Sequence, residues 1–334
     1  MTEIKKKAIL DVLNIALQRE IEAFNYYQKA GNKAYYQETE ALLIQLAEEE
    51  RKHRLFLLRE IERINNLMAE EIEESHVEAE AVKYQIPEEI PFKRLQSVSG
   101  VDLSATSLPT ELLGGDFFDT MPLYREDKNP ALGIFLYDVM GHGMEATHLK
   151  ALAKNKFGLI REAWVEKRPD VDMWKPYQVI TNLNKNLIEH CQSCGRFVSA
   201  FYGVVDPVEN TFTYTSAGHD PPIYIKVEGV YIHLNKTELL LGVDDTLTYK
   251  ENVVPITEGD ILTIFSDGIT EAINSQEEMF TRIRLANSIK NVTEYSAAEI
   301  LSHIFSDLRA FLQDEPLDDE ITIGVLKISK ENSK

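Results

Sequence analysis

Four aspartates in the C-terminal two thirds of this chain stand in settings that could hold a divalent metal ion: Asp116, Asp138, Asp267 and Asp319. Three of them lie beside an apolar run of strand length, and two adjoin glycines. A strand fixes a carboxylate at its end, and glycine lets backbone and water approach closely. Carboxylates without His or Cys make a hard oxygen site, which favours Mg²⁺ or Mn²⁺ over Zn²⁺. We therefore expect a magnesium or manganese centre.

An aspartate beside a glycine is also a common composition for a tight turn. Taken alone, any single such pair would be interpreted as a turn. Their number and their similar surroundings favour a shared site instead.

Short strands and a few helices would position these side chains. Runs of β-type residues, separated by Gly, Pro, Asp and Asn, occupy 132–137, 197–205, 211–215, 223–227, 261–265 and 321–328. Helical patterns occupy 144–168, 175–191 and 296–313. Many short strands with few helices predict an α+β domain of about 240 residues.

Residues 1–75 have a different composition, with one Gly, no Pro and many Ala, Leu, Ile, Glu, Lys and Gln. Such residues favour helices. The segment Gly31-Asn32-Lys33 would end one helix and form a turn. We expect a first helix over about 3–30 and a second from about 36 to at least 68.

Pro87 and Pro91 mark the passage from helical to β-rich sequence. Before them, residues 69–81 are acidic and Ala-rich, and could continue the helix or act as a connector. A length of 334 residues leaves room for about two domains. The predicted parts are a helical hairpin (1–68), a linker (69–91) and the α+β domain (92–330).

The charge balance argues against some partners. The chain has 55 Asp plus Glu against 35 Lys plus Arg, a formal net charge of −20. This sign repels nucleic-acid backbones and anionic membranes, so we expect neither as a partner. No apolar run approaches the roughly 20 residues of a transmembrane helix, and no signal peptide is visible. With only two cysteines, these features favour a cytoplasmic location.

The sequence over about 92–329 resembles the metal-dependent (type 2C, PPM) protein phosphatases, in the bacterial SpoIIE-like branch. The segments that carry the resemblance follow the order of the family: Pro109 to Asp119, Asp138 to Gly143, Arg196 to Ala200, Ser216 to Pro222, Leu241-Gly242, Ser266 to Ala272 and Asp319 to Thr322. The resemblance implies two antiparallel sheets packed face to face, with helices outside.

The same resemblance implies a chemistry. Asp138 would bridge two Mn²⁺ or Mg²⁺ ions, and the carbonyl of Val139 would be a further ligand. Asp116, Asp267 and Asp319 would complete the site directly or through water. A water between ions about 3.5–4 Å apart would attack the phosphorus in line. The expected enzyme is a phosphoserine/phosphothreonine protein phosphatase, and its substrate a phosphorylated STAS-domain antagonist of an anti-sigma factor.

The chain departs from the family pattern at Phe118, Met140 and Glu320, where Tyr, Ser and a second Asp are commoner. We expect none of these to be an indispensable ligand, and no phosphate-binding Arg can be identified by motif. His142 could protonate the leaving oxygen, although holding the glycine turn is the favoured role. For His219 we expect a hydrogen bond between the sheets.

Cys191 and Cys194 form a Cys-x-x-Cys pair. A redox switch is one interpretation, whereas a zinc site would lack enough nearby ligands. Two unpaired thiols are the default expectation for a cytosolic chain.

The N-terminal helices carry ionisable residues in the middle of their apolar stripes. Glu20 interrupts the stripe of the first helix, and Glu50 and His53 interrupt that of the second. Glu50 and His53 are i, i+3 neighbours and face the same way. A buried carboxylate on a helix seam is costly unless it is paired or bound to metal. Glu22 is an alternative ligand to Glu20 if the register slips.

A Glu on one helix with Glu-x-x-His on its partner is half of a di-iron carboxylate site, which needs four helices. A symmetric homodimer would complete the four-helix bundle and the site. The segments Glu20 to Tyr27 and Leu46 to His53 also resemble rubrerythrins and two-helix ferritin-like proteins. We expect one di-iron centre per dimer, built from Glu20, Glu50 and His53, that regulates the phosphatase through iron redox state or oxygen.

Three alternatives stay open. The hairpin could be a dimerisation or partner-binding module without metal, with Glu20 and His53 in polar contact across the seam. The phosphatase domain could be an inactive binding scaffold, although four retained aspartates argue against this. The N-terminal site could be the chief enzyme, a ferritin-like oxidase or peroxidase, although its small share of the chain argues against that.

Overall fold

The computed structural model describes residues 85–93, 95–108, 116–125, 128–141, 144–167, 170–235, 238–313, 315–317 and 319–329, together with Ala23, Leu42, Leu43 and Leu46. The chain divides into two compact units, Met1–Val82 and Lys83–Lys334. The four described residues of the first unit are helical. The predicted four-helix bundle otherwise lies outside the described residues and stays a prediction, as do the predicted domain boundaries.

The second unit contains two five-stranded antiparallel sheets. The first sheet has the strand order β1 (Val101–Leu108), β10 (Ile321–Ile328), β9 (Ile261–Phe265), β6 (Ile223–Ile225) and β7 (Tyr231–Ile232). The second has the order β2 (Phe117–Arg125), β3 (Lys128–Val139), β4 (Val198–Asp206), β5 (Thr211–Ala217) and β8 (Asn252–Pro255). The two packed antiparallel sheets predicted above are confirmed.

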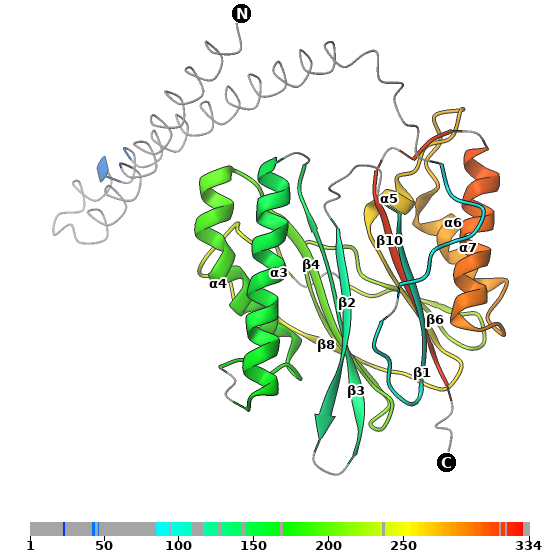
Figure 1. Cartoon of the computed structure of the whole chain (residues 1–334), viewed down its shortest axis with the longest axis horizontal. Helices are drawn as coiled ribbons and strands as arrows, with labels where there is room; N and C mark the ends of the chain where they lie inside the picture. Colours follow the sequence, from blue (N-terminus) through cyan, green and yellow to red (C-terminus); the bar gives the residue numbers. More distant parts are fainter. Residues whose placement is uncertain are drawn as a thin grey trace, which may run out of the picture. The chain divides into compact units, whose positions relative to one another are not determined.

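Helices cover the outer face of each sheet (Figure 1). The second sheet is covered by α3 (Met144–Val165) and α4 (Pro176–Cys194), and the first by α6 (Thr281–Lys290) and α7 (Ala297–Leu312). The short helix α5 (Asp267–Thr270) follows β9 directly. None of the described helices is long and apolar enough to cross a membrane.

Alternate side chains of β3 point to opposite faces of its sheet. One set packs between the two sheets: Leu132, Ile134 and Leu136. The other set packs under α3 and α4: Ala131, Phe135, Tyr137 and Val139. Because both faces of β3 are covered, its sequence is one continuous apolar run. Asp138 continues the first set, so its carboxylate points between the sheets.

The segment that enters the second unit, residues 85–93, packs against the helical layer of the first sheet. Ile86 and Ile90 are partly buried against the core that lies under α6 and α7. Arg309 of α7 donates from Nη2 to the carbonyl of Pro87 at 2.6 Å. The segment is therefore anchored to the rest of the second unit by both apolar and polar contacts.

Candidate active site

In the second sheet, the strand register places Asp116 and Asp138 beside each other. Asp138 is the penultimate residue of β3, and Asp116 directly precedes β2. Phe117 pairs with Tyr137 across these antiparallel strands, so the two aspartates are the next opposing pair. Both continue the set of side chains that points between the sheets.

In the first sheet, Asp267 and Asp319 lie where two neighbouring strands meet. β9 ends at Phe265, and β10 runs antiparallel to it, with Phe265 paired to Ile323. Asp267 is the first residue of α5, two residues beyond β9, and Asp319 stands two residues before β10. The end of β9 and the start of β10 therefore hold these two aspartates together.

The acidic residues of the two sheets lie close enough for their charges to repel one another. Burial raises the pKa of Asp138 to about 7, and the charges of Asp267, Asp319 and Glu320 add to the rise. Burial also raises the pKa of Asp267, with the charge of Asp319 as the next cause. Carboxylates that repel one another in a buried setting favour a cation between them.

Asp116 is nearly buried, with 7% of its surface exposed. Burial raises its pKa well above the ordinary value, and the charges of Asp138 and Glu320 raise it further. Hydrogen bonds from Ser266 and Thr322 act in the opposite direction. Its Oδ2 atom is buried and accepts no hydrogen bond from the described residues. A buried carboxylate oxygen without a donor is costly, and a bound cation would relieve that cost.

Glu320, which sequence reasoning did not single out as a ligand, belongs to this cluster. Its Oε2 accepts a hydrogen bond of 2.9 Å from the backbone N–H of Asp116 and lies 3.9 Å from Lys150 Nζ. Glu320 is buried, whereas Asp319 is exposed. Continuing the alternation of β10 backwards puts Glu320 on the inward face with Thr322.

Two glycines of the motifs are required because other groups approach their Cα atoms too closely for a Cβ. A Cβ at Gly268 would overlap the carbonyl oxygen of Glu320, so only glycine lets α5 begin beside the loop that precedes β10. Gly141 has a φ of +82°, in the left-handed region that favours glycine. Its missing Cβ leaves room for Arg196, which donates from Nη1 to the carbonyl of Met140 at 3.0 Å.

His219 links the two sheets beside the carboxylates. Its Nδ1 lies 2.9 Å from the hydroxyl of Ser199 in β4, and its Nε2 lies 3.1 Å from the carbonyl of Phe265 in β9. A carbonyl can only accept, so Nε2 carries the proton and Nδ1 accepts from the serine. The predicted role of His219 between the sheets is confirmed.

The donor set fits Mg²⁺ or Mn²⁺, because the cluster offers carboxylate oxygens and an unsatisfied buried oxygen at Asp116. Within the described part of the chain, no three His, Cys, Asp or Glu side chains form a group that could by itself hold an ion. The ligand set would therefore be completed through water, as expected from the sequence, or by small side-chain movements. The carbonyl of Val139 stays a predicted ligand.

Five candidate functional residues from the sequence lie outside the described part of the chain: Glu20, Glu22, Glu50, His53 and His142. The two cysteines are described, and neither forms a disulfide bond. Burial raises the pKa of Cys191 to about 12, and the neighbouring Cys194 adds to the rise. A high pKa disfavours the reactive thiolate, so the structure favours the unpaired-thiol interpretation.

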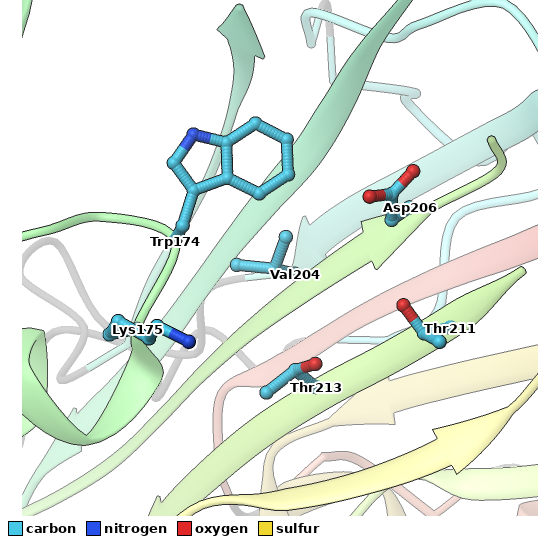
Figure 2. Close-up of a pocket in the computed structure, with 6 residues that line it drawn as sticks. All are labelled: Trp174, Lys175, Val204, Asp206, Thr211 and Thr213. Carbon is cyan, nitrogen blue, oxygen red and sulfur yellow. The ribbon is translucent and has the colours of Figure 1, made fainter. Parts of the chain in front are cut away.

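A separate hollow lies at the other end of β4 (Figure 2). It is lined by Trp174, Lys175, Val204, Asp206, Thr211 and Thr213. Asp206 is the last residue of β4, whereas Ser199, which pairs with Asp138, stands near its start. Only one lining residue is acidic, so this hollow does not offer the carboxylates that a hard metal ion needs.

Two packed antiparallel sheets with outer helices and a partly buried acidic cluster at one end define a PP2C-type phosphatase fold. The SiaA-PP2C domain of Pseudomonas aeruginosa has this fold, with a TM-score of 0.56, 18% identity, and coverage of 68% of this chain and 85% of that one. The phosphatase domain of SpoIIE from Bacillus subtilis, solved with a fragment of its regulatory domain, gives a TM-score of 0.55 at 15% identity, covering 73% and 71%.

Residues 128–329 match the family model described as Stage II sporulation protein E (SpoIIE). This match covers more than half of the chain, and the chain belongs to the SpoIIE family. Residues 11–94 match the model of a second family, described as Rubrerythrin. The two matched families are those that the sequence motifs resembled.

Two curated relatives are similar over most of this chain. The phosphoserine phosphatase RsbU of Bacillus subtilis (strain 168) is 28% identical over 228 residues, which cover 68% of this chain and 63% of RsbU. Protein IcfG of Synechocystis sp. is 24% identical over 280 residues, covering 78% of this chain and 43% of IcfG. The chain thus spans less than two thirds of the length of either relative.

Proposed function

We propose that this chain is a metal-dependent protein phosphatase that hydrolyses phosphoserine and phosphothreonine. The observation that carries the proposal is the pairing of Asp116 with Asp138 at the end of the second sheet, where burial raises the pKa of Asp138 to about 7 and the charges of Asp267 and Asp319 add to the rise. The family match and the similarity to RsbU, which is named a phosphoserine phosphatase, support the same activity.

Two Mn²⁺ or Mg²⁺ ions held here would lower the pKa of a water molecule and offset the charge of the phosphoryl group. The side chains of this chain fix where those ions would lie. Asp138 points between the sheets from β3, Asp116 offers its unsatisfied Oδ2, and Asp267 and Asp319 approach from the opposite sheet. We propose the carbonyl of Val139 as the remaining protein ligand.

The rest of the cluster orients these ligands. The carboxylate of Glu320 accepts a hydrogen bond from the backbone N–H of Asp116 and so holds that backbone in place. Ser266 and Thr322 donate to the carboxylate of Asp116. His219 ties β4 to β9 at this level. Such outer contacts keep ligands within the narrow geometry that catalysis requires.

The proposed substrate is a phosphorylated STAS-domain antagonist of an anti-sigma factor. Support comes from the resemblance of the motifs to the SpoIIE-like branch. A structure of the RsbU and RsbW domains of Rv1364c from Mycobacterium tuberculosis shares the fold, with a TM-score of 0.57 at 18% identity, covering 72% of this chain and 64% of that one. At 18% identity this similarity supports only the fold of the proposed enzyme. The proposal of the substrate depends on the sequence motifs.

The proposed role of the N-terminal unit is regulation through a di-iron centre, shared by the two chains of a homodimer. Glu20, Glu50 and His53 of each chain would be the ligands. The match of residues 11–94 to the Rubrerythrin family supports this proposal. Iron content of the full-length dimer, compared with a Glu50→Ala, His53→Ala variant, tests it, since two irons per dimer should be lost in the variant.

The activity is tested with the full-length protein and a phosphoserine peptide, with and without Mn²⁺. We expect manganese-dependent phosphate release that Asp138→Asn abolishes. Asp245→Asn is the matched control, because Asp245 is an exposed aspartate outside the cluster. Phosphate release that is equal with and without metal, or that survives Asp138→Asn unchanged, would contradict the proposal.

A further inference from the structure

Two lysines reach the carboxylate cluster from elements outside the acidic motifs. Lys150 lies in the second turn of α3, and its Nζ is 3.9 Å from Glu320 Oε2. The side chain of Lys150 is 24% exposed, so it stands between the buried Glu320 and solvent. An ammonium has three donors, so it can keep Glu320 as a neighbour while binding another oxygen.

Lys93 comes from the segment that enters the catalytic unit. Its backbone N–H donates to the carbonyl of Ala105 in β1 at 2.7 Å. The hydroxyl of Thr106 donates to the carbonyl of Pro91 at 2.6 Å. These two contacts hold residues 91–93 alongside β1, and the side chain of Lys93 is half-buried.

The ammonium group of Lys93 lies close enough to the cluster to interact with its charges. Burial lowers the pKa of Lys93, and the charge of Glu320 opposes that effect most strongly, followed by Asp116. The next charge in order of effect is Lys150. Lys93 therefore lies near Glu320 and Asp116 and near Lys150, which itself approaches Glu320.

A phosphate ester dianion entering this cluster meets several carboxylates, so binding needs cationic donors in addition to the metal ions. The sequence motifs identify no arginine that would bind the phosphate. Two ammonium groups beside the carboxylates, one of them facing solvent, provide positive charge where a phosphoryl oxygen would arrive. Lysine binds phosphate as a point charge without the fixed geometry of arginine.

We propose that Lys93 and Lys150 bind the phosphoryl group of the substrate at the edge of the carboxylate cluster. This inference rests on the proposed phosphatase function and names the residues that would recognise the phosphate. It also gives the entering segment, residues 85–93, a residue within the active site.

The test measures binding of inorganic phosphate to the manganese-loaded full-length protein by calorimetry, together with KM and kcat for a phosphoserine peptide. The variants are Lys93→Gln and Lys150→Gln, with Lys93→Arg and Lys150→Arg as charge-retaining partners. Lys185→Gln is the control, because Lys185 is an exposed lysine on α4. We expect each Gln variant to weaken phosphate binding about tenfold and to raise KM more than it lowers kcat.

The Arg variants should recover most of the phosphate affinity, and the control should match the wild type. Manganese affinity is measured in parallel, because lysines that only balance the charge of the carboxylates would change metal binding and leave phosphate binding intact. That result, or phosphate affinity unchanged in folded Gln variants, would overturn the inference. Absence of peptide hydrolysis in the wild type would instead contradict the proposed function, while phosphate binding would still test the lysines.

Discussion

The side chain of Glu320 accepts the backbone N–H of Asp116 at 2.9 Å, although the two residues lie 204 positions apart. Asp116 leads into β2 of the second sheet, and Glu320 leads into β10 of the first. The bond therefore joins the two sheets at the carboxylate cluster. It also fixes the backbone of the aspartate whose Oδ2 is left without a donor.

Replacing Glu320 tests how much this hydrogen bond contributes to the stability of the fold. Glu320→Ala leaves the buried N–H of Asp116 without an acceptor, which should lower the free energy of unfolding by about 1–3 kcal/mol relative to Glu320→Gln, since both variants remove the repulsion between Glu320 and the aspartates. Glu320→Gln keeps an acceptor oxygen and should lose less. Urea unfolding of the metal-free proteins measures both. Equal losses in the two variants would show that the bond to Asp116 contributes little.

The link through His219 is tested with a double-mutant cycle on His219→Ala and Ser199→Ala. The two side chains are hydrogen-bonded at 2.9 Å, so their effects on unfolding should not add. We expect a coupling of about 1 kcal/mol in the free energy of unfolding. Additive losses would mean that the imidazole is held by Phe265 and its packing alone.

Asp260 should make stability depend on acid pH. Its buried carboxylate accepts hydrogen bonds from Lys226 Nζ at 2.9 Å and Tyr224 Oη at 2.7 Å, and from two backbone N–H groups. Burial raises the pKa of Asp260, but these donors outweigh burial and hold it below the ordinary value. A carboxyl with a folded pKa below its unfolded pKa stabilises the fold above the unfolded value and loses that contribution as pH falls.

Asp260→Asn should therefore lower the free energy of unfolding by about 3 kcal/mol at pH 7. The difference from wild type should narrow as pH falls below about 4, because the carboxyl of the unfolded chain is protonated there and that of the folded protein follows at lower pH. Urea unfolding across this range measures the difference, with Asp245→Asn as the exposed control. A difference that stays constant down to pH 3 would exclude the ionised carboxylate as its source.

The thiols should differ in reactivity. Cys191 is fully buried with a pKa near 12, whereas Cys194 is partly exposed. In the native protein at pH 8, iodoacetamide should label Cys194 well before Cys191, as followed by mass spectrometry of peptides. Urea-unfolded protein should lose the difference. Rapid native labelling of Cys191, or an oxidised pair in the purified protein, would restore the redox-switch interpretation.

Much of this fold could be predicted from the sequence, because its central strands are buried on both faces. The apolar runs at 132–137, 261–265 and 321–328 correspond to β3, β9 and β10. β1 was not predicted, since its sequence mixes Ser, Thr and Asp with few large apolar residues. α6 was missed for a similar reason, because only four of its ten residues are buried.

The four aspartates could be found because each stands in a recognisable local sequence. Glu320 could have been found by counting alternation through β10, where Ile321 and Ile323 face the outer core and Glu320 and Thr322 must then face inward. Lys93 and Lys150 had no such signal. Their position depends on where α3 and the entering segment pack, which no local pattern encodes.

Calorimetric titration of the metal-free full-length protein with Mn²⁺ tests the central claim, that the aspartates of the two sheets form one metal centre. We predict two manganese ions bound per chain in addition to any at the N-terminal unit. Asp138→Asn should lose this binding and Asp245→Asn should retain it, with both variants folded by circular dichroism. Manganese binding that is absent from the wild type, or unchanged in Asp138→Asn, would contradict the account.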